Sequence, residues 1–226
     1  MTDIIMRIFE QLVYKQQLSS ALKTAIGPDQ FAYKEGLNTT MALIKCQHHW
    51  MEWLDRDADF VRVFSFDFSK AFDSVPHQVL CTKLKSYDIN PFITNWIISF
   101  LSGRQQRVVV NGIVTDFLNI NRGVPQGTVL GPILFSIMVN DIKPVFPKNQ
   151  LFKYADDLTL SVPVKFNSVD TSHLEVANIQ QWADENKMKM NMKTFEMIVK
   201  GKTQKSVLPP LEGICRKNEL KLIGVT

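Results

Sequence analysis

The sequence predicts an α/β fold of the α+β type, in which one mixed sheet packs on helices. Three observations support this prediction: a β-branched and aromatic run at 60–66, two patterns typical of β-hairpins at 107–115 and 151–162, and apolar residues at helical spacing around them. The chain of 226 residues is 45% hydrophobic and 21% charged, which is ordinary for a globular protein and excludes intrinsic disorder. Its length allows one large domain or two small ones.

The first part of the chain is predicted to be helical up to a first strand. Apolar residues recur at helical spacing over the first twenty residues, and Gly27 with Pro28 ends this helix. Asn38 is placed to cap a second helix that runs to about Leu54. A polar loop then leads into the run at 60–66, whose β-branched and aromatic residues indicate a buried strand.

Two helices and a hairpin are predicted next. The helices are expected at 76–87 and 91–103, because proline is well tolerated in the first helical turn. Two β-branched runs then flank Asn111-Gly112, and this dipeptide favours a type I′ turn, which needs positive φ at both central residues.

The last part of the chain is predicted to alternate between helices and strands. A loop with two glycines and a proline at 123–127 leads into an apolar helix at about 130–143. A second hairpin is expected over 151–162, with Asp156 and Asp157 at its tip, and an amphipathic helix at about 170–187. The remaining strands are expected at Phe195–Val199 and Leu220–Val225.

The charge is mild overall but uneven along the chain. The net charge is +4, with 26 Lys and Arg against 22 Asp and Glu. Residues 187–226 hold nine of the basic residues and only three Glu, so this end permits a polyanionic partner. Three widely spaced cysteines form no disulfide or zinc pattern, and we expect buried thiols in a reducing compartment. No leader opens the chain and its apolar stretches are too short to cross a bilayer, so we expect an intracellular protein without a membrane partner.

Three carboxylates stand out against this background. Asp67 follows the first predicted strand, and Asp156 and Asp157 lie at the tip of the second hairpin. Each alone is typical of a cap or a turn. If the strand and the hairpin pair in one sheet, like charges come close together, and protonation or a cation must relieve their repulsion. Oxygen ligands without His or Cys suit Mg²⁺.

Ordered motifs around these acids resemble the reverse transcriptases of non-LTR (LINE-like) retrotransposons. The motifs are Gln30-Phe-Ala-Tyr-Lys-Glu-Gly36, Phe66-Asp67-Phe-Ser-Lys-Ala-Phe-Asp73, Arg122-Gly-Val-Pro-Gln-Gly-Thr-Val-Leu-Gly-Pro132, Tyr154-Ala-Asp-Asp157, Trp182-Ala-Asp-Glu-Asn186, Asn191-Met-Lys-Thr194 and Lys221-Leu-Ile-Gly-Val225. The resemblance implies a right-hand polymerase palm with part of the fingers. Residues 1–59 would belong to the fingers and 60–226 to the palm with inserted segments. The thumb and other domains are expected outside this stretch, which alone is expected to fall short of a whole enzyme.

The resemblance also implies roles for the acids. Asp67 and Asp156 would bind two Mg²⁺ ions, or Mn²⁺ in their place, with Asp157 in the same cluster. One ion would lower the pKa of a primer 3′-hydroxyl and the other would stabilise the departing pyrophosphate. Lys193 matches a lysine proposed in polymerases to protonate that pyrophosphate; a solvated lysine is the alternative.

Further residues match positions that face the incoming nucleotide in the family. Phe72 matches the steric gate, where a bulky ring collides with a ribose 2′-hydroxyl, although a core aromatic is the alternative. Lys70 and Ala71 match the stretch facing the triphosphate, and Gln126 and Gly127 belong to a loop near the nascent base pair. Asp73 is interpreted as a helix cap or a local hydrogen-bond acceptor.

The predicted function is that of an RNA-directed DNA polymerase core. Its partners would be an RNA template, a DNA primer and dNTPs, and the sequence leaves the oligomeric state open. Where the family usually has arginines near the first glycine, this chain has Lys34, Glu35 and Leu37, so contacts from that stretch are not carried over. One alternative is a non-catalytic retroelement remnant that at most binds nucleic acid weakly. An RNA-dependent RNA polymerase is disfavoured, because that class usually has Gly-Asp-Asp at the hairpin and lacks an aromatic gate.

Overall fold

The computed structural model describes residues 4–191, 194–201 and 208–223, which divide into two compact units. Unit 1 comprises the chain up to Gly27 and residues 70–140, and unit 2 comprises residues 28–69 and the chain from Asp141 onward. Each unit is described by itself. The predicted division into fingers and palm stays a prediction.

Unit 2 contains a five-stranded sheet in the order β6-β7-β1-β8-β9. The strands are β1 (Phe60–Phe66), β6 (Gln150–Tyr154), β7 (Asp157–Val164), β8 (Phe195–Lys200) and β9 (Cys215–Arg216). β1 lies in the middle and pairs antiparallel with both β7 and β8, whereas β8 and β9 run parallel. The sheet is therefore mixed, and the predicted strand at 60–66 and hairpin at 151–162 are confirmed.

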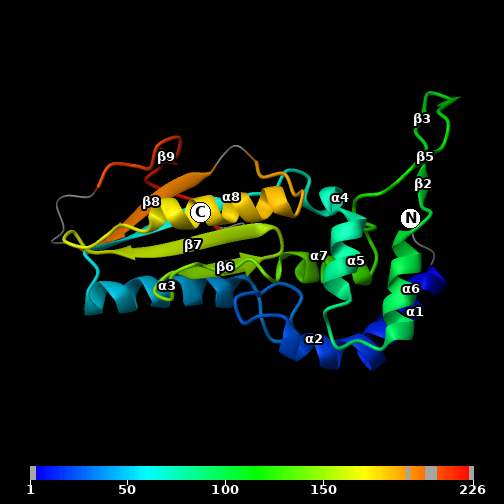
Figure 1. The fold of residues 1–226 in the computed structure, drawn as a ribbon, viewed down its shortest axis with the longest axis horizontal. Helices are drawn as coiled ribbons and strands as arrows, with labels where there is room; N and C mark the ends of the chain where they lie inside the picture. Colours follow the sequence, from blue (N-terminus) through cyan, green and yellow to red (C-terminus); the bar gives the residue numbers. More distant parts are fainter. Residues whose placement is uncertain (1–3, 192–193, 202–207, 224–226) are drawn as a thin grey trace. The chain divides into compact units, whose positions relative to one another are not determined.

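Helices cover both faces of this sheet (Figure 1). α3 (Thr39–Arg56) begins at the predicted cap, where the Asn38 side chain accepts a hydrogen bond from the Met41 backbone N–H. Its buried residues pack with alternate β1 side chains in a core cluster that includes Cys46, Val61 and Val63. α8 (Ser172–Glu185) lies on the other side. Because β1 is covered on both faces, its residues are apolar nearly throughout instead of alternating with polar ones.

Two sequence predictions are wrong. Leu220–Ile223, the described part of the expected strand at 220–225, is no strand, because Ile223 has φ +54° and the apolar side chains pack into the core cluster instead. The cysteines are not all buried thiols. Cys46 is buried, but Cys81 is partly exposed and Cys215 is exposed, so the prediction of buried thiols holds for one of the three.

Unit 1 is built from helices. They are α1 (Ile4–Val13), a π-helical segment (Tyr14–Leu18), α2 (Ser19–Ala25), α4 (Ala71–Ser74), α5 (His77–Leu84), α6 (Pro91–Leu101) and α7 (Leu130–Val139). α7 is buried along almost its whole length. It ends four residues before the predicted 143. At this end, the Asn140 side chain accepts from the Gly27 N–H at 2.9 Å and donates to the Ala25 carbonyl at 2.9 Å.

A two-stranded ribbon, residues 104–120, extends from the end of α6 (Figure 1). It contains β2 (Gln105–Gln106), β3 (Val109–Val110), β4 (Ile113–Val114) and β5 (Leu118–Asn119). Asn111 and Gly112 have φ of +50° and +80°, so the predicted turn with two positive φ angles is confirmed.

Candidate active site

The pairing of β1 with β7 decides where the three predicted acids meet. The register places Phe66 opposite Leu158, so the next residue along each strand, Asp67 and Asp157, follows at the same end of the sheet. Asp156 occupies the hairpin turn between β6 and β7, after Ala155 with φ +54°. The structure therefore brings all three acids together within unit 2.

Electrostatics show that these carboxylates interact. Burial raises the pKa of the Asp157 carboxyl, and the negative charges of Asp156 and Asp67 raise that pKa further, while Lys221 lowers it. The repulsion that the sequence predicted for a shared sheet is therefore present. A bound cation would relieve it by favouring the charged form of each carboxylate.

Three neighbours of the acids were missed from the sequence. Asn191 donates from its backbone N–H to the Asp67 carbonyl at 2.7 Å and from its amide to Asp67 Oδ2 at 3.2 Å. Tyr33 lies near Asp156, since burial and the Asp156 charge both raise the pKa of its phenol. Lys221 opposes the charge of Asp157. Asn191 and Lys221 each begin a family-like motif, and this was the available signal.

The donor chemistry fits a hard divalent cation, because the site offers carboxylate oxygens and neither His nor Cys. Within the described residues, no group of three His, Cys, Asp or Glu side chains is arranged to hold a metal ion. Mg²⁺ is usually held by one or two carboxylates, with waters and substrate phosphates completing its coordination. The three acids could supply part of such a ligand set.

In unit 1, the loop at 123–127 is fastened to α4. The Val124 N–H donates to the Phe72 carbonyl, and the Gly123 N–H donates to the Val75 carbonyl, both at 2.8 Å. Gly123 has φ +87°, and a Cβ atom there would lie 2.9 Å from the Asp73 carbonyl oxygen. Only glycine permits this close approach of two backbones.

The predicted nucleotide-facing residues of unit 1 surround this junction. The Phe72 ring stacks on Phe135 of α7, with 4.6 Å between ring centroids. Gln126 donates from its amide to Asp73 Oδ1 at 2.8 Å, so Asp73 is the local acceptor that one interpretation of the sequence expected. Lys70 and Gly127 have φ of +51° and +74°, and the remaining residue of the set, Ala71, is buried. Lys193 lies outside the described residues.

A buried carboxylate anchors the start of α7, directly after this loop. Glu10 of α1 is fully buried, and its Oε2 accepts from the backbone N–H groups of Val129 and Leu130 at 2.8 and 3.1 Å. A negative charge at the first turn of α7 is favourable, because it pairs with unsatisfied donors and with the helix dipole. The partner lies 119 residues away, so no sequence pattern predicted it.

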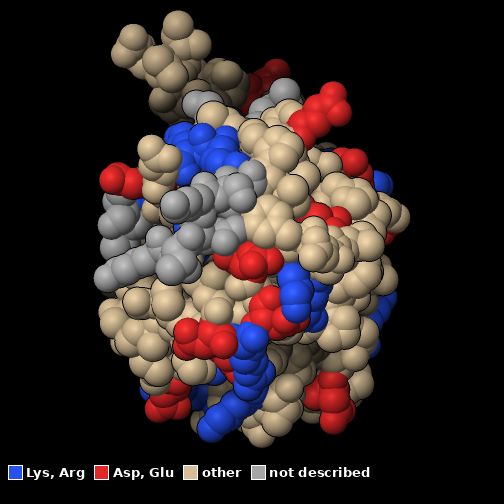
Figure 2. Space-filling view, turned by 90° about the vertical axis from the view of Figure 1, so that its left-hand side faces the viewer, with Lys and Arg blue, Asp and Glu red and all other residues tan. Residues whose placement is uncertain are grey.

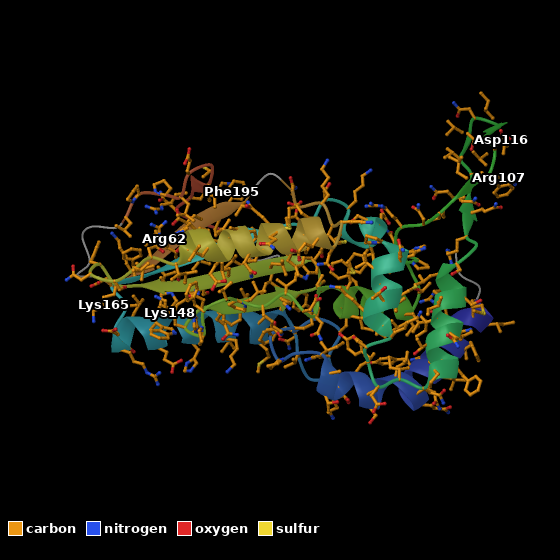
Figure 3. All side chains as sticks on the ribbon, viewed as in Figure 1. Arg62, Arg107, Asp116, Lys148, Lys165 and Phe195 are labelled. Carbon is orange, nitrogen blue, oxygen red and sulfur yellow. The ribbon has the colours of Figure 1, made fainter. Side chains whose placement is uncertain are left out.

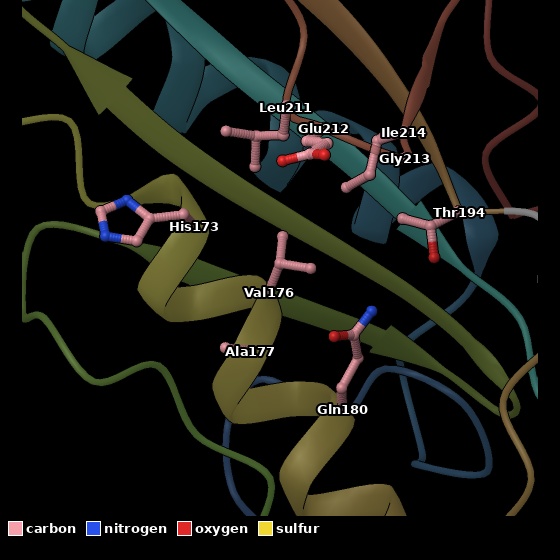
Figure 4. Close-up of a pocket in the computed structure, with 9 residues that line it drawn as sticks. All are labelled: His173, Val176, Ala177, Gln180, Thr194, Leu211, Glu212, Gly213 and Ile214. Atoms are coloured by element: carbon pink, nitrogen blue, oxygen red, sulfur yellow. The ribbon is translucent and has the colours of Figure 1, made fainter.

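A separate cavity of about 330 Å³ lies in unit 2 between α8 and the segment at 211–214. Figure 4 shows apolar Val176, Leu211 and Ile214 beside the polar side chains of His173 and Gln180. None of the predicted site residues lines it.

Of the helices that the structure describes, none is long and apolar enough to span a membrane.

Curated relatives of this chain are retrotransposon polymerases. The chain is 26% identical to the probable RNA-directed DNA polymerase from transposon BS of Drosophila melanogaster, over 97% of this chain and 26% of that protein. It is 30% identical to the RNA-directed DNA polymerase from mobile element jockey of the same organism, over 82% of this chain and 21% of that protein. The chain thus spans about a quarter of the length of these relatives.

A solved structure shares the fold. Telomerase from Candida tropicalis, in complex with the TWJ fragment of telomeric RNA, matches with a TM-score of 0.60 and 12% identity, over 88% of this chain and 36% of that one. The mixed sheet packed on helices that the sequence predicted is therefore confirmed. The family model described as reverse transcriptase (RNA-dependent DNA polymerase) matches residues 1–226, as the ordered motifs indicated. The chain belongs to the reverse transcriptase family.

Proposed function

We propose that this chain carries the core of an RNA-directed DNA polymerase, which transfers a nucleotide from a dNTP to the 3′-hydroxyl of a primer on an RNA template. The observation that supports this proposal most directly is the β1–β7 register, which places Asp67 beside Asp157 and the Asp156 turn. The names of the curated relatives point to the same activity for the longer proteins.

In this proposal Asp67 and Asp156 hold divalent cations, with Asp157 adjoining them. Mg²⁺ is the expected ion and Mn²⁺ a substitute, because both prefer carboxylate oxygens. Two such ions, when bound, supply activation of the attacking hydroxyl and stabilisation of the departing pyrophosphate. Asn191 orients the Asp67 carboxylate through its amide contact of 3.2 Å, and Lys221 limits the excess negative charge at Asp157.

Nucleotide selection is assigned to unit 1. Phe72 comes five residues after Asp67 in the sequence, and its stacking on Phe135 fixes the orientation of the ring. A fixed bulky ring suits discrimination against a ribose 2′-hydroxyl, because it cannot turn aside. Lys70, Ala71, Gln126 and Gly127 are assigned to contacts with the incoming nucleotide. Lys193 as the donor of a proton to pyrophosphate stays a prediction.

Primer extension on an RNA template with Mg²⁺ tests the proposal, both in this chain and in the full reading frame that encodes it. Asp156→Asn keeps the size of the side chain but removes its charge, so synthesis should be abolished. Asp55→Asn, at an exposed position on α3, is the matched control and should leave synthesis unchanged. Full activity of Asp156→Asn would exclude the metal assignment. Nucleic-acid binding without synthesis in any divalent cation would instead favour a non-catalytic remnant.

A further inference from the structure

Strand β6 of unit 2 carries a fully buried lysine, Lys153, three residues before Asp156. Its Nζ lies 3.0 Å from Oδ2 of Asp29, whose side chain is 8% exposed. A lysine is almost never fully buried unless it is paired. Lys165 shows the ordinary arrangement: it follows the end of β7 that lies away from the acids, it is half exposed, and it pairs with Asp57 at the surface (Figure 3).

The same lysine also joins a second segment of unit 2 to β6 through its backbone. The Lys153 N–H donates to the Asp29 carbonyl at 2.8 Å, and the Lys153 carbonyl accepts from the Phe31 N–H at 2.9 Å. Gln30 and Lys153 are accordingly paired as a parallel bridge. One residue of β6 therefore holds the segment at 29–31 through two backbone hydrogen bonds and one ion pair.

The segment at 29–31 leads directly to Tyr33. Because the bridge between Gln30 and Lys153 is parallel, Tyr33 and Asp156 each follow it by three residues. Burial raises the pKa of the Tyr33 phenol and the charge of Asp156 raises it further, so the two side chains interact. Tyr33 has φ +60°, which is uncommon for a bulky residue and persists only where the surrounding structure holds it.

Stability alone does not explain an ion pair at this position. Leu151 and Phe152, the preceding residues of β6, are apolar and buried. Replacing a buried ion pair by apolar side chains is often neutral or stabilising, because burial of the two charges is costly. A buried pair does select one arrangement of two segments, because its charges are satisfied only there. The pair of Lys153 and Asp29 is therefore better explained by positioning than by stability.

Asp29 has a second cationic partner, which provides a matched control. Lys143 Nζ lies 2.7 and 2.9 Å from the two oxygens of Asp29, and its side chain is 50% exposed. Both lysines bring the same charge to the same carboxylate, but only Lys153 belongs to the strand that leads to Asp156. Loss of Lys153 also leaves Asp29 paired with Lys143, so it creates no isolated buried charge.

We propose that Lys153 is a positioning residue for the cation site at Asp156. Through Asp29 it fixes the segment that carries Tyr33. The Tyr33 hydroxyl in turn orients the Asp156 carboxylate, since a phenol can donate a hydrogen bond to a carboxylate oxygen. Partners of this kind change metal affinity by about 10–100-fold. The inference rests on the proposed function in one respect, which is the assignment of a divalent cation to Asp156.

Hydrogen exchange of the chain without metal tests the first step. Lys153→Met keeps a side chain of similar length but removes its charge. Peptides covering residues 28–36 should then exchange at least about tenfold faster, because the segment opens more readily from β6. Lys143→Met removes the same charge from the exposed partner and should change the exchange rate by less than about twofold. Circular dichroism verifies that each variant is folded.

Binding of Mn²⁺, measured by electron paramagnetic resonance without nucleic acid or dNTP, tests the second step. Tyr33→Phe removes only a hydroxyl at a position that is 47% exposed, and it should raise the Kd about tenfold. Lys153→Met should raise the Kd to a similar extent. The double variant Lys153→Met/Tyr33→Phe should add little further, because both changes act on Asp156 by one route. Lys143→Met should leave the Kd unchanged.

Three outcomes would overturn the inference. Equal effects of Lys153→Met and Lys143→Met would mean that only the charge near Asp29 matters. Unchanged Mn²⁺ binding in Tyr33→Phe would exclude Tyr33 as the orienting group. Additive losses in the double variant would mean that Lys153 does not act through Tyr33.

Failure of the proposed function has a different signature in the same experiments. The original chain would then bind no Mn²⁺, or Asp156→Asn would bind it as tightly as the original chain does. Hydrogen exchange over residues 28–36 would still report whether Lys153 fixes the segment, because it is measured without metal or synthesis.

Discussion

The buried charges around Arg62 lead to a quantitative prediction about stability. Arg62 of β1 is 2% exposed and contacts Glu196 Oε1 at 2.8 Å, Asp170 Oδ2 at 3.1 Å and the Pro209 carbonyl at 3.0 Å. Glu196 of β8 is fully buried and also accepts from Arg216 at both oxygens, each at 3.0 Å. Glu196 is therefore the centre of the cluster, and Arg62 is one of its two cationic partners.

This arrangement predicts unequal costs for removing the two partners. Glu196→Gln leaves two guanidinium groups without their shared anion, and breaking a buried ion pair in this way costs about 3–5 kcal/mol. Arg62→Met removes the contacts with Glu196, Asp170 and the Pro209 carbonyl, but Glu196 keeps Arg216 as a cationic partner, so the fully buried carboxylate is not left unpaired and the cost should be about 1–3 kcal/mol. The free energy of unfolding should fall more for Glu196→Gln than for Arg62→Met.

Urea unfolding followed by tryptophan fluorescence measures both costs. Trp50, Trp53 and Trp182 lie in unit 2, whereas Trp96 lies in unit 1, so a Trp96→Phe background makes the signal specific to the unit that holds the cluster. Arg56→Met is the control, because Arg56 is 68% exposed and pairs with Glu52 on the surface of α3. Equal costs for the two buried substitutions, or a larger cost for Arg62→Met, would refute the reasoning.

Two further predictions concern nucleotide choice and acid stability. Phe72→Ala should raise the ratio of ribonucleotide to deoxynucleotide incorporation at least about tenfold in single-nucleotide extension, since the ring is the proposed barrier to the 2′-hydroxyl, and an unchanged ratio would reject the gate. Burial lowers the pKa of His49 from 6.5 to about 4 between the rings of Trp53 and Phe152, so the unfolded chain binds a proton that the folded chain does not between these pH values. The contribution of neutral His49 to the free energy of unfolding is therefore fully present above pH 6.5 and is lost as the pH falls toward 4. Thermal unfolding of His49→Leu across this window should show a smaller loss than the original chain or the exposed-neighbour variant His48→Leu, and identical profiles would contradict the assignment.

Surface charge is mixed on the face that Figure 2 shows. Acidic and basic side chains are interspersed on this face. The net charge of +4 is therefore not gathered into a single patch on that face.

Local patterns in the sequence predicted many of the elements and singled out the three acids. The Asn38 cap, the Asn111-Gly112 turn and the run at 60–66 each depend on interactions within a few residues, and the structure has all three where the sequence predicted them. Such features are predictable because dihedral preferences, capping and apolar periodicity act over short distances.

The tertiary structure alone decided which distant residues meet. The β1–β7 register places Asp67 beside Asp157, Glu196 neutralises Arg62 across 134 residues, and Glu10 caps α7 from 119 residues away. It also turned Leu220–Ile223 into core packing instead of a strand. These outcomes depend on burial and on charge pairing between segments that are far apart in the sequence. Local propensities do not encode them, because these partners come into contact only when the chain folds.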